Sequence, residues 1–124
     1  MTTTVLVIDD SFTVRQHVAT ILVADGYDVV EACDGLAGLE AVRTHEEIAM
    51  ILCDVHMPRM DGLEFLEKVK GEIRRETPVV MLTTEGSPEI LVRAKQAGAR
   101  GWIVKPFQPE RLLDAVRRIV GLLS

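Results

Sequence analysis

The chain has 124 residues, of which 48% are hydrophobic and 27% are charged, and its formal net charge is -5. This length fits one domain with a sizeable core, and the negative charge argues against a basic surface for nucleic acid. The apolar runs are too short for membrane spans, and residues 1–4 lack the basic start and apolar stretch of a signal peptide. We therefore expect a cytoplasmic protein with neither nucleic acid nor membrane as a partner.

Elements of two kinds alternate along the chain. Short apolar or β-branched runs between turn signals predict strands, and apolar residues at helical spacing predict the helices between them. In chain order, we expect a strand over 5–8, a helix over 12–24, a strand over 28–32, a helix over 35–43, a strand over 48–54, a helix over 62–73, a strand over 79–83, a helix over 88–97, a strand over 101–104 and a helix over 109–122.

Local signals mark the beginnings of two of these helices. Ser11 is placed to cap the first helix, and Ser87, Pro88 and Glu89 supply an N-cap, a first-turn proline and a first-turn acid for the fourth. The apolar stripe of the second helix is expected on three residues, Leu36, Leu39 and Val42. Five strands alternating with five helices require right-handed crossovers and a parallel sheet covered on both faces, with the 28–32 strand at an edge.

The two cysteines, Cys33 and Cys53, form neither a CxxC pair nor a spacing typical of zinc ligands. In a reducing compartment such thiols act as small apolar side chains. We predict that both are buried, and we assign them no function.

Four predicted strands end in polar side chains. Asp9 and Asp10 follow the first strand, Asp54 ends the third, Thr83 ends the fourth and Lys105 follows the fifth. In an open α/β sheet, ligands bind outside the carboxyl ends of the strands. Three carboxylates brought together there repel one another and need a counter-charge, and few protein ligands around an open site suit Mg²⁺. A metal, an ammonium group and a hydroxyl donor around a carboxylate are equipment for phosphoryl transfer to that carboxylate.

The whole pattern resembles the receiver domain of two-component response regulators, and is most similar to stand-alone chemotaxis-type (CheY-like) receivers. The resemblance covers essentially the whole chain and rests on these motifs: Asp9-Asp10, Asp54, Met57-Pro58, Asp61-Gly62, Thr83, Gln96-Ala97-Gly98-Ala99 and Lys105-Pro106-Phe107. It implies a flavodoxin-like sheet of strand order 2-1-3-4-5. It also implies a single receiver domain over residues 1–124 without an output domain.

The resemblance assigns roles to the polar strand ends. Asp54 would accept a phosphoryl group from a histidine kinase or a phosphotransfer protein. Mg²⁺ would be held by four groups: the side chains of Asp9, Asp10 and Asp54 and the backbone carbonyl of His56. Thr83 and Lys105 would contact the phosphoryl oxygens, and the Lys105–Pro106 peptide bond would be cis. Such a protein is a signalling receiver that catalyses its own phosphorylation and dephosphorylation, and is not otherwise an enzyme.

The resemblance also suggests how the signal leaves the domain. Thr83 would move toward the phosphoryl group, and the aromatic residue three before the lysine, here Trp102, would swing inward as a switch. A target protein would then bind the face formed by the fourth helix, the fifth strand and the fifth helix. His56 and Glu85 stand at the two positions that tune dephosphorylation in such proteins.

Three alternatives stay open at this point. A small phosphohydrolase of the haloacid dehalogenase type also uses an Asp nucleophile, Mg²⁺, Thr and Lys, although Asp9-Asp10 is not its DxD pattern. A flavodoxin-like FMN carrier would need a Ser/Thr-rich phosphate loop after the first strand, which is missing. A receiver-shaped protein-interaction module that works without phosphorylation is the third.

Overall fold

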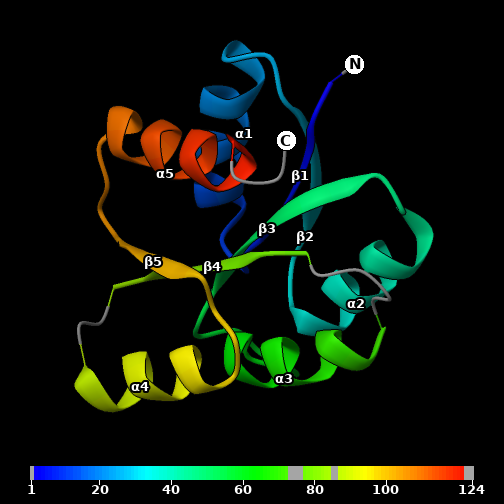
Figure 1. Ribbon diagram of the computed structural model, residues 1–124, viewed down its shortest axis with the longest axis vertical. Coiled ribbons are helices and arrows are strands. Elements are labelled where there is room, and N and C mark those ends of the chain that lie inside the picture. Colours follow the sequence, from blue (N-terminus) through cyan, green and yellow to red (C-terminus); the bar gives the residue numbers. More distant parts are fainter. Residues whose placement is uncertain (1, 73–76, 85–86, 122–124) are drawn as a thin grey trace.

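The structure is a computed structural model that describes residues 2–72, 77–84 and 87–121, in which strands and helices alternate (Figure 1). The elements are β1 (Thr4–Ile8), α1 (Phe12–Ala24), β2 (Asp28–Ala32), α2 (Gly35–Thr44), β3 (Ile48–Asp54), α3 (Gly62–Glu72), β4 (Val79–Thr83), α4 (Pro88–Gln96), β5 (Gly101–Val104) and α5 (Pro109–Gly121). The predicted α/β fold class is confirmed. The ends expected for two helices, at residues 73 and 122, lie outside the described residues.

All five strands form one parallel sheet in the order β2-β1-β3-β4-β5. This confirms the predicted order and the edge position of β2. The order reverses between β1 and β3, which is where doubly wound sheets bind ligands. Because Ile8 pairs with Cys53 in this register, the residues that follow them, Asp9 and Asp54, leave the sheet side by side.

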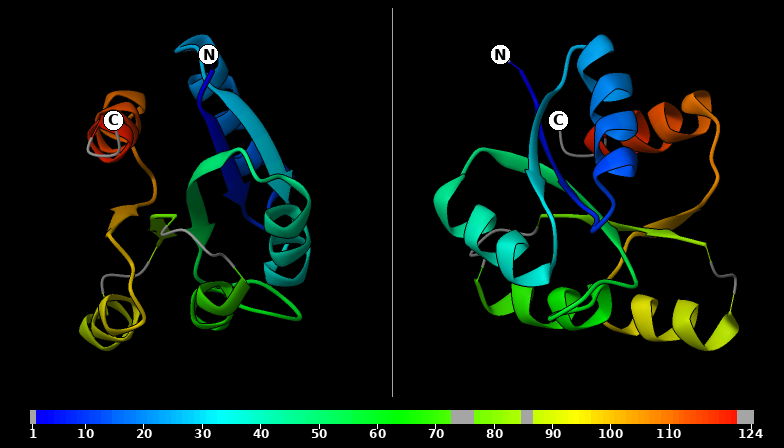
Figure 2. Two further views of the ribbon diagram at one scale, coloured as in Figure 1. Left: turned by 45° about the vertical axis from the view of Figure 1, so that its right-hand side comes forward. Right: turned by 180° about the vertical axis from the view of Figure 1, so that it is seen from behind.

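Helices cover both faces of the sheet. Figures 1 and 2 place α1 and α5 on one face, and α2, α3 and α4 on the other. Each face has its own core because alternate strand residues point in opposite directions. The α1 and α5 face buries Val5, Val7, Val18, Leu22, Met50, Leu52, Val80, Leu82, Ile103, Leu112 and Val116. The other face is built around residues that include Leu6, Ile8, Leu39, Ile51, Phe65, Leu66, Val69 and Met81.

The predicted helix beginnings are correct, with one difference in chemistry. The Ser11 hydroxyl accepts a hydrogen bond from the Val14 amide at 3.3 Å and so caps α1. Ser87 occupies the N-cap position of α4 and Pro88 follows it in the first turn, but the Ser87 side chain makes no capping hydrogen bond. The proline at this position needs no partner for an amide hydrogen, so α4 begins with one fewer unsatisfied donor.

Two predictions about burial are wrong. Leu36 is 47% exposed because the buried stripe of α2 is centred on Gly35, Gly38 and Leu39. A Cβ on Gly38 would lie 2.5 Å from Ile8 Cδ1, so the two glycines let α2 approach its neighbours with a face that excludes Leu36. Cys33 is exposed, whereas Cys53 is buried as predicted. Cys33 follows the inward-facing Ala32 at the end of an edge strand, where alternation turns the next side chain outward.

None of the helices within the described ranges combines the length and the apolar character that crossing a membrane requires.

Candidate functional site

Three carboxylates meet at the carboxyl edge of the central strands. One oxygen from each of Asp9, Asp10 and Asp54 lies within 4.8 Å of the other two. Asp9 is fully buried, Asp54 is buried and Asp10 is exposed, so the cluster opens to solvent on the Asp10 side. Each strand end is held by hydrogen bonds of the sheet, which makes the relative positions of Asp9 and Asp54 a property of the fold.

Lys105 follows β5, the edge strand opposite β2, and its side chain contacts two of these carboxylates. Its Nζ lies 2.9 Å from Asp9 Oδ2 and 3.3 Å from Asp54 Oδ1. The Lys105 amide donates to the Thr83 carbonyl at 2.8 Å, and the Lys105–Pro106 peptide bond is cis, as the resemblance implied. The ammonium group thus reaches the acidic cluster from the loop that follows β5.

The charges in this cluster alter one another's ionisation. Burial raises the pKa of Asp54, the negative charge of Asp9 raises it further, and Lys105 opposes both effects. Burial alone disfavours the ammonium form of Lys105, but its contacts with Asp9 and Asp54 outweigh this and raise its pKa. The Asp54 carboxylate is therefore repelled by Asp9, and a further positive charge would relieve this repulsion. Perturbed pKa values of this kind are typical of functional sites.

The donor set fits a hard divalent cation. Asp9 Oδ1 accepts a hydrogen bond from the Ser11 amide at 2.9 Å, which fixes the orientation of its carboxylate. The three carboxylates offer few protein ligands, and because Asp10 is exposed the cluster leaves room for water. That combination suits Mg²⁺, which binds oxygen and keeps several waters.

The loop after β3 is tied back to the strand by backbone contacts. The Gly62 amide donates to the Val55 carbonyl at 2.8 Å. Asp61 and Glu64 form a capping box at the beginning of α3, because the Glu64 amide donates to Asp61 Oδ1 at 2.9 Å and the Asp61 amide donates to Glu64 Oε1 at 3.3 Å. The sequence Asp-x-x-Glu carries this signal, and the sequence analysis did not use it. These contacts bring the beginning of α3 close to Asp54.

A second tie links this loop to α2. Asp34 caps α2 by accepting from the Ala37 amide at 2.8 Å, and its other oxygen pairs with the Arg59 guanidinium, with Nε at 2.7 Å. The Ala37 amide first and Arg59 second lower the pKa of Asp34. Arg59 has a φ of 66°, which is uncommon for a side-chain-bearing residue, so the pair holds a strained turn in place.

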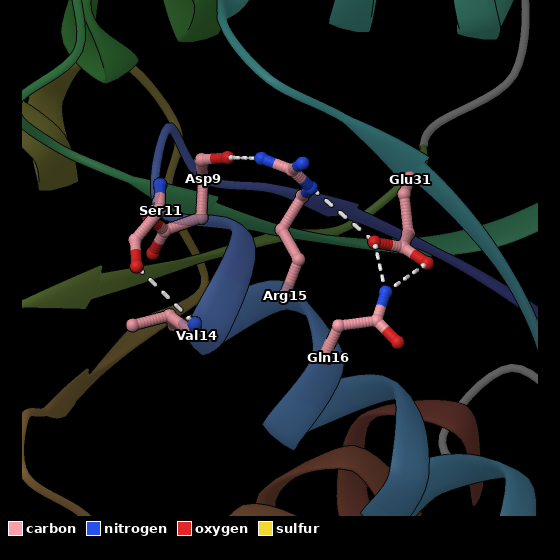
Figure 3. Close-up of polar contacts among 6 residues, drawn as sticks. All are labelled: Asp9, Ser11, Val14, Arg15, Gln16 and Glu31. Atoms are coloured by element: carbon pink, nitrogen blue, oxygen red, sulfur yellow. Dashed lines mark hydrogen bonds and ion pairs between the residues drawn. The ribbon is translucent and has the colours of Figure 1, made fainter.

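Arg15 forms a contact that the sequence did not reveal. Figure 3 shows its guanidinium between the Asp9 carbonyl and the Glu31 carboxylate of β2, and Gln16, the next residue of α1, also donates to Glu31. Arg15 and Gln16 lie on α1 and Glu31 lies on the edge strand β2, and they meet because α1 docks beside the paired strands β1 and β2. A single Arg in the first helix gives no pattern from which this contact could be foreseen.

The other residues singled out in the sequence lie around this edge or beside it. Thr83 is buried and follows Leu82, the strand partner of Asp54. His56 is exposed in the loop after β3. Trp102 lies on β5 and is 40% exposed. Glu85 lies outside the described residues.

A parallel sheet of order 2-1-3-4-5 with an acidic cluster and a lysine at its carboxyl edge defines the CheY-like class of α/β proteins. The family model of the response regulator receiver domain matches residues 5–117, and the chain belongs to that family. It is a receiver of CheY type, which is a signalling protein of two-component systems and not a metabolic enzyme. The phosphohydrolase and flavodoxin alternatives are therefore set aside.

Individual relatives agree with this assignment over nearly the whole chain. A chemotaxis protein CheY homolog of Campylobacter jejuni is 36% identical over 118 residues, which cover 94% of this chain and 91% of that protein. The chemotaxis protein CheY1 of Helicobacter pylori is also 36% identical, over 94% and 95% of the two chains. Among solved structures, the chemotaxis response regulator CheY4 of Vibrio cholerae is 41% identical with a TM-score of 0.88, covering 96% of this chain and 99% of that one.

Proposed function

We propose that this chain acts as a single receiver domain whose Asp54 accepts a phosphoryl group in a Mg²⁺-dependent reaction. The donor would be a histidine kinase or a phosphotransfer protein. The observation that carries the proposal is the contact of one ammonium, Lys105 Nζ, with both Asp9 and Asp54 inside a cluster of three carboxylates. Relatives named for chemotaxis are similar in sequence, and one such protein of known structure, CheY4 of Vibrio cholerae, has the same fold, so we expect control of a partner protein as the output.

The proposed reaction is an in-line displacement at phosphorus. An Asp54 carboxylate oxygen forms a new O–P bond while the bond between phosphorus and the donor breaks. The electron pair of the broken bond stays with the donor, on an imidazole nitrogen of phosphohistidine or on an oxygen of acetate. Catalysis of such a transfer consists mainly of positioning and charge neutralisation.

The residues of the cluster would divide these tasks. Asp9, Asp10, Asp54 and the His56 carbonyl would hold Mg²⁺, which supplies charge neutralisation at the transferred phosphoryl group. Lys105 already contacts Asp54, and it would exchange part of that contact for a phosphoryl oxygen once the charge on Asp54 moves outward. Thr83, one residue beyond the strand partner of Asp54, would donate its hydroxyl to another oxygen.

The output surface that we propose is the α4-β5-α5 face. Exposed apolar side chains lie on two of its elements: Val92 on α4, with 53% of its surface exposed, and Trp102 and Val104 on β5, with 40% and 53% exposed. Apolar side chains left exposed beside one another are a feature of protein-binding surfaces. Movement of Thr83 toward the phosphoryl group would let Trp102 turn inward and so alter this face. His56 and Glu85 would tune how fast water removes the phosphoryl group.

The direct test is the intact mass of the protein after incubation with acetyl phosphate and Mg²⁺. We expect a gain of one phosphoryl group in the wild type, and no gain in Asp54→Ala or in the presence of a chelator. Asp28→Ala is a matched control, because Asp28 is an exposed aspartate at the beginning of β2, the end of the strand away from the cluster. It should be phosphorylated like the wild type.

The opposite result would favour the remaining alternative. If the wild type gains no phosphoryl group from acetyl phosphate or from a phosphorylated kinase domain, the chain is better described as a receiver-shaped interaction module that works without phosphorylation. If Asp54→Ala gains the group as readily as the wild type, the acceptor is wrongly assigned.

A further inference from the structure

The Arg15 side chain spans the space between the acidic cluster and the edge strand. Its Nη1 donates to the backbone carbonyl of Asp9 at 2.7 Å, and its Nε donates to Glu31 Oε1 at 3.2 Å (Figure 3). The Arg15 side chain is only 15% exposed and that of Glu31 is 33% exposed, so water competes little for the arginine. Both bonds involve a charged partner, and such bonds are the stronger kind in proteins.

The carbonyl that Arg15 holds belongs to the peptide unit that joins Asp9 and Asp10. A peptide unit is planar, so the direction of the Asp9 carbonyl also sets the position of the Asp10 Cα and the starting direction of its side chain. Asp9 itself is already fixed, because its amide donates to the Ala32 carbonyl at 3.1 Å and its carboxylate accepts from Ser11 and Lys105. What Arg15 adds is control over the plane that leads to Asp10.

Glu31 holds the arginine in the orientation that this contact needs. Glu31 pairs with Val7 in the sheet, and both of its carboxylate oxygens accept from Gln16 Nε2 at 3.2 Å. The guanidinium thus uses two different nitrogens at a fixed angle, one for the carbonyl and one for the anchor. A lysine has a single ammonium on a flexible stem and does not reproduce that fork.

We propose that Arg15, anchored by Glu31, is a positioning residue that orients the Asp9–Asp10 peptide so that both carboxylates can bind one divalent cation. The inference rests on the proposed function, since it concerns the cation that the acidic cluster would hold. Arg15 touches no reacting atom. It acts through the backbone that carries two of the three carboxylates.

Charge alone predicts the opposite effect, which makes the proposal easy to test. Arg15 is a cation close to a site for cations, so its removal should strengthen Mg²⁺ binding if charge were its only contribution. Loss of an outer partner that orients metal ligands weakens metal binding instead, typically 10- to 100-fold. The sign of the change in Mg²⁺ affinity therefore separates the two explanations.

The experiment is a calorimetric titration of metal-free protein with Mg²⁺, in the absence of any phosphoryl donor. We expect the Kd to rise about tenfold or more in Arg15→Gln, to rise similarly in Arg15→Lys, and to rise less in Glu31→Gln. The double variant should bind no more weakly than Arg15→Gln alone, because Glu31 acts only through Arg15. Arg43→Gln is the matched control. Arg43 lies near the end of α2 and also donates from two guanidinium nitrogens to a glutamate, Glu72 of α3.

A second measurement uses the rate of phosphorylation by acetyl phosphate as a function of Mg²⁺ concentration. The Mg²⁺ concentration for half the maximal rate should rise by the same factor as the Kd, while the maximal rate stays near that of the wild type. Far-ultraviolet circular dichroism and the melting temperature of each metal-free variant establish that it is folded. Should Arg15→Gln not fold, Arg15→Lys and Glu31→Gln carry the same test.

The outcomes are distinct. An unchanged or lowered Kd in folded Arg15→Gln overturns the inference and leaves the proposed function intact, and so does a lower maximal rate with an unchanged Mg²⁺ requirement. Failure of the wild type itself to bind Mg²⁺ overturns the proposed function, and this inference with it.

Discussion

Gly62 lies so close to the backbone carbonyl of Asp54 that a Cβ on Gly62 would overlap the carbonyl oxygen. The same Cβ would lie 2.9 Å from Met81 Cε. The first residue of α3 thus packs directly against the backbone of the proposed phosphoacceptor, with no room for a side chain between them. The loop that leaves Asp54 therefore returns to it after a few residues, and the acceptor is held from β3 and from α3 together.

Replacement of Gly62 by alanine should consequently destabilise the fold and disturb the site. We expect Gly62→Ala to lower the free energy of unfolding by about 2 to 3 kcal/mol, because the overlap is with backbone and cannot be relieved by a side-chain rotation. Urea unfolding measures this loss. Phosphorylation by acetyl phosphate should also slow, because the displaced carbonyl belongs to Asp54.

Gly71, in the last turn of the same helix, provides the control. A Cβ there meets no atom within 4 Å. Gly71→Ala should therefore leave phosphorylation unchanged and raise stability by up to about 1 kcal/mol, since alanine is the better helix former. Equal stability of the two variants would contradict the close contact between Gly62 and Asp54.

The ion pair between Asp34 and Arg59 leads to a pH-dependent prediction. The pKa of Asp34 is lowered from its ordinary value of 3.8, first by the Ala37 amide and then by Arg59. Ionised Asp34 therefore contributes stability that is fully present above the ordinary pKa of an aspartate. This contribution is lost as the pH falls through the lowered pKa of the folded state. The wild type should therefore lose stability more steeply than Asp34→Asn below about pH 4.

Two variants separate the cap from the ion pair. Asparagine caps helices about as well as aspartate, so Asp34→Asn should lose mainly the contribution of Arg59. Asp34→Ala removes the cap as well and should be less stable than the asparagine variant by about 1 kcal/mol at pH 7. Urea unfolding at pH 7 and at acid pH gives both comparisons, and identical acid profiles for wild type and Asp34→Asn would contradict the assigned pKa shift.

The sequence predicts the central strands well because β1, β3 and β4 are buried on both faces. Continuous apolar runs such as 48–54 leave little freedom in where a strand begins and ends, and the polar residue after each run then falls at the carboxyl edge. Lys105 and Asp9 are 96 residues apart, yet strand order alone places them at that edge. The acidic cluster could therefore be anticipated in outline.

Contacts between polar side chains on different elements could not be anticipated in this way. Arg15 meets Glu31, and Arg59 meets Asp34, only because helices and loops are docked at particular angles on the sheet. Apolar periodicity indicates which face of an element is inward, but not which of several charged residues will meet. Even the inward face is misjudged where glycines carry the contact, as Leu36 on α2 demonstrates.

Asp54 itself should reduce the stability of the metal-free protein. Its pKa is raised by burial and by the charge of Asp9, so the folded state binds this proton more tightly than the unfolded chain does. Protonated Asp54 therefore contributes stability that is fully present below the ordinary pKa of an aspartate. This contribution is lost as the pH rises through the raised pKa of the folded state. At neutral pH, Asp54→Asn should therefore be more stable than the wild type when a chelator is present.

Addition of Mg²⁺ completes this comparison. A cation that binds only the folded state stabilises it in proportion to its affinity, and it should stabilise the wild type more than Asp54→Asn, which has one carboxylate fewer. Thermal melting of both proteins with chelator and with Mg²⁺ gives the four values needed. A wild type that is the more stable of the two in chelator would contradict the repulsion assigned to Asp54.

Trp102 allows the output step to be followed directly, because it is the single tryptophan of the chain. Trp102 is 40% exposed, so its emission should be that of a partly hydrated indole and acrylamide should be able to quench it. If phosphorylation of Asp54 draws Thr83 forward and Trp102 turns inward, the emission should shift to shorter wavelength and quenching should fall. Asp54→Ala, treated with the same acetyl phosphate and Mg²⁺, should do neither. Emission that stays unchanged in a wild type shown by its mass to be phosphorylated would mean that Trp102 remains on the surface, and that a target would have to recognise a change in the position of α4 instead.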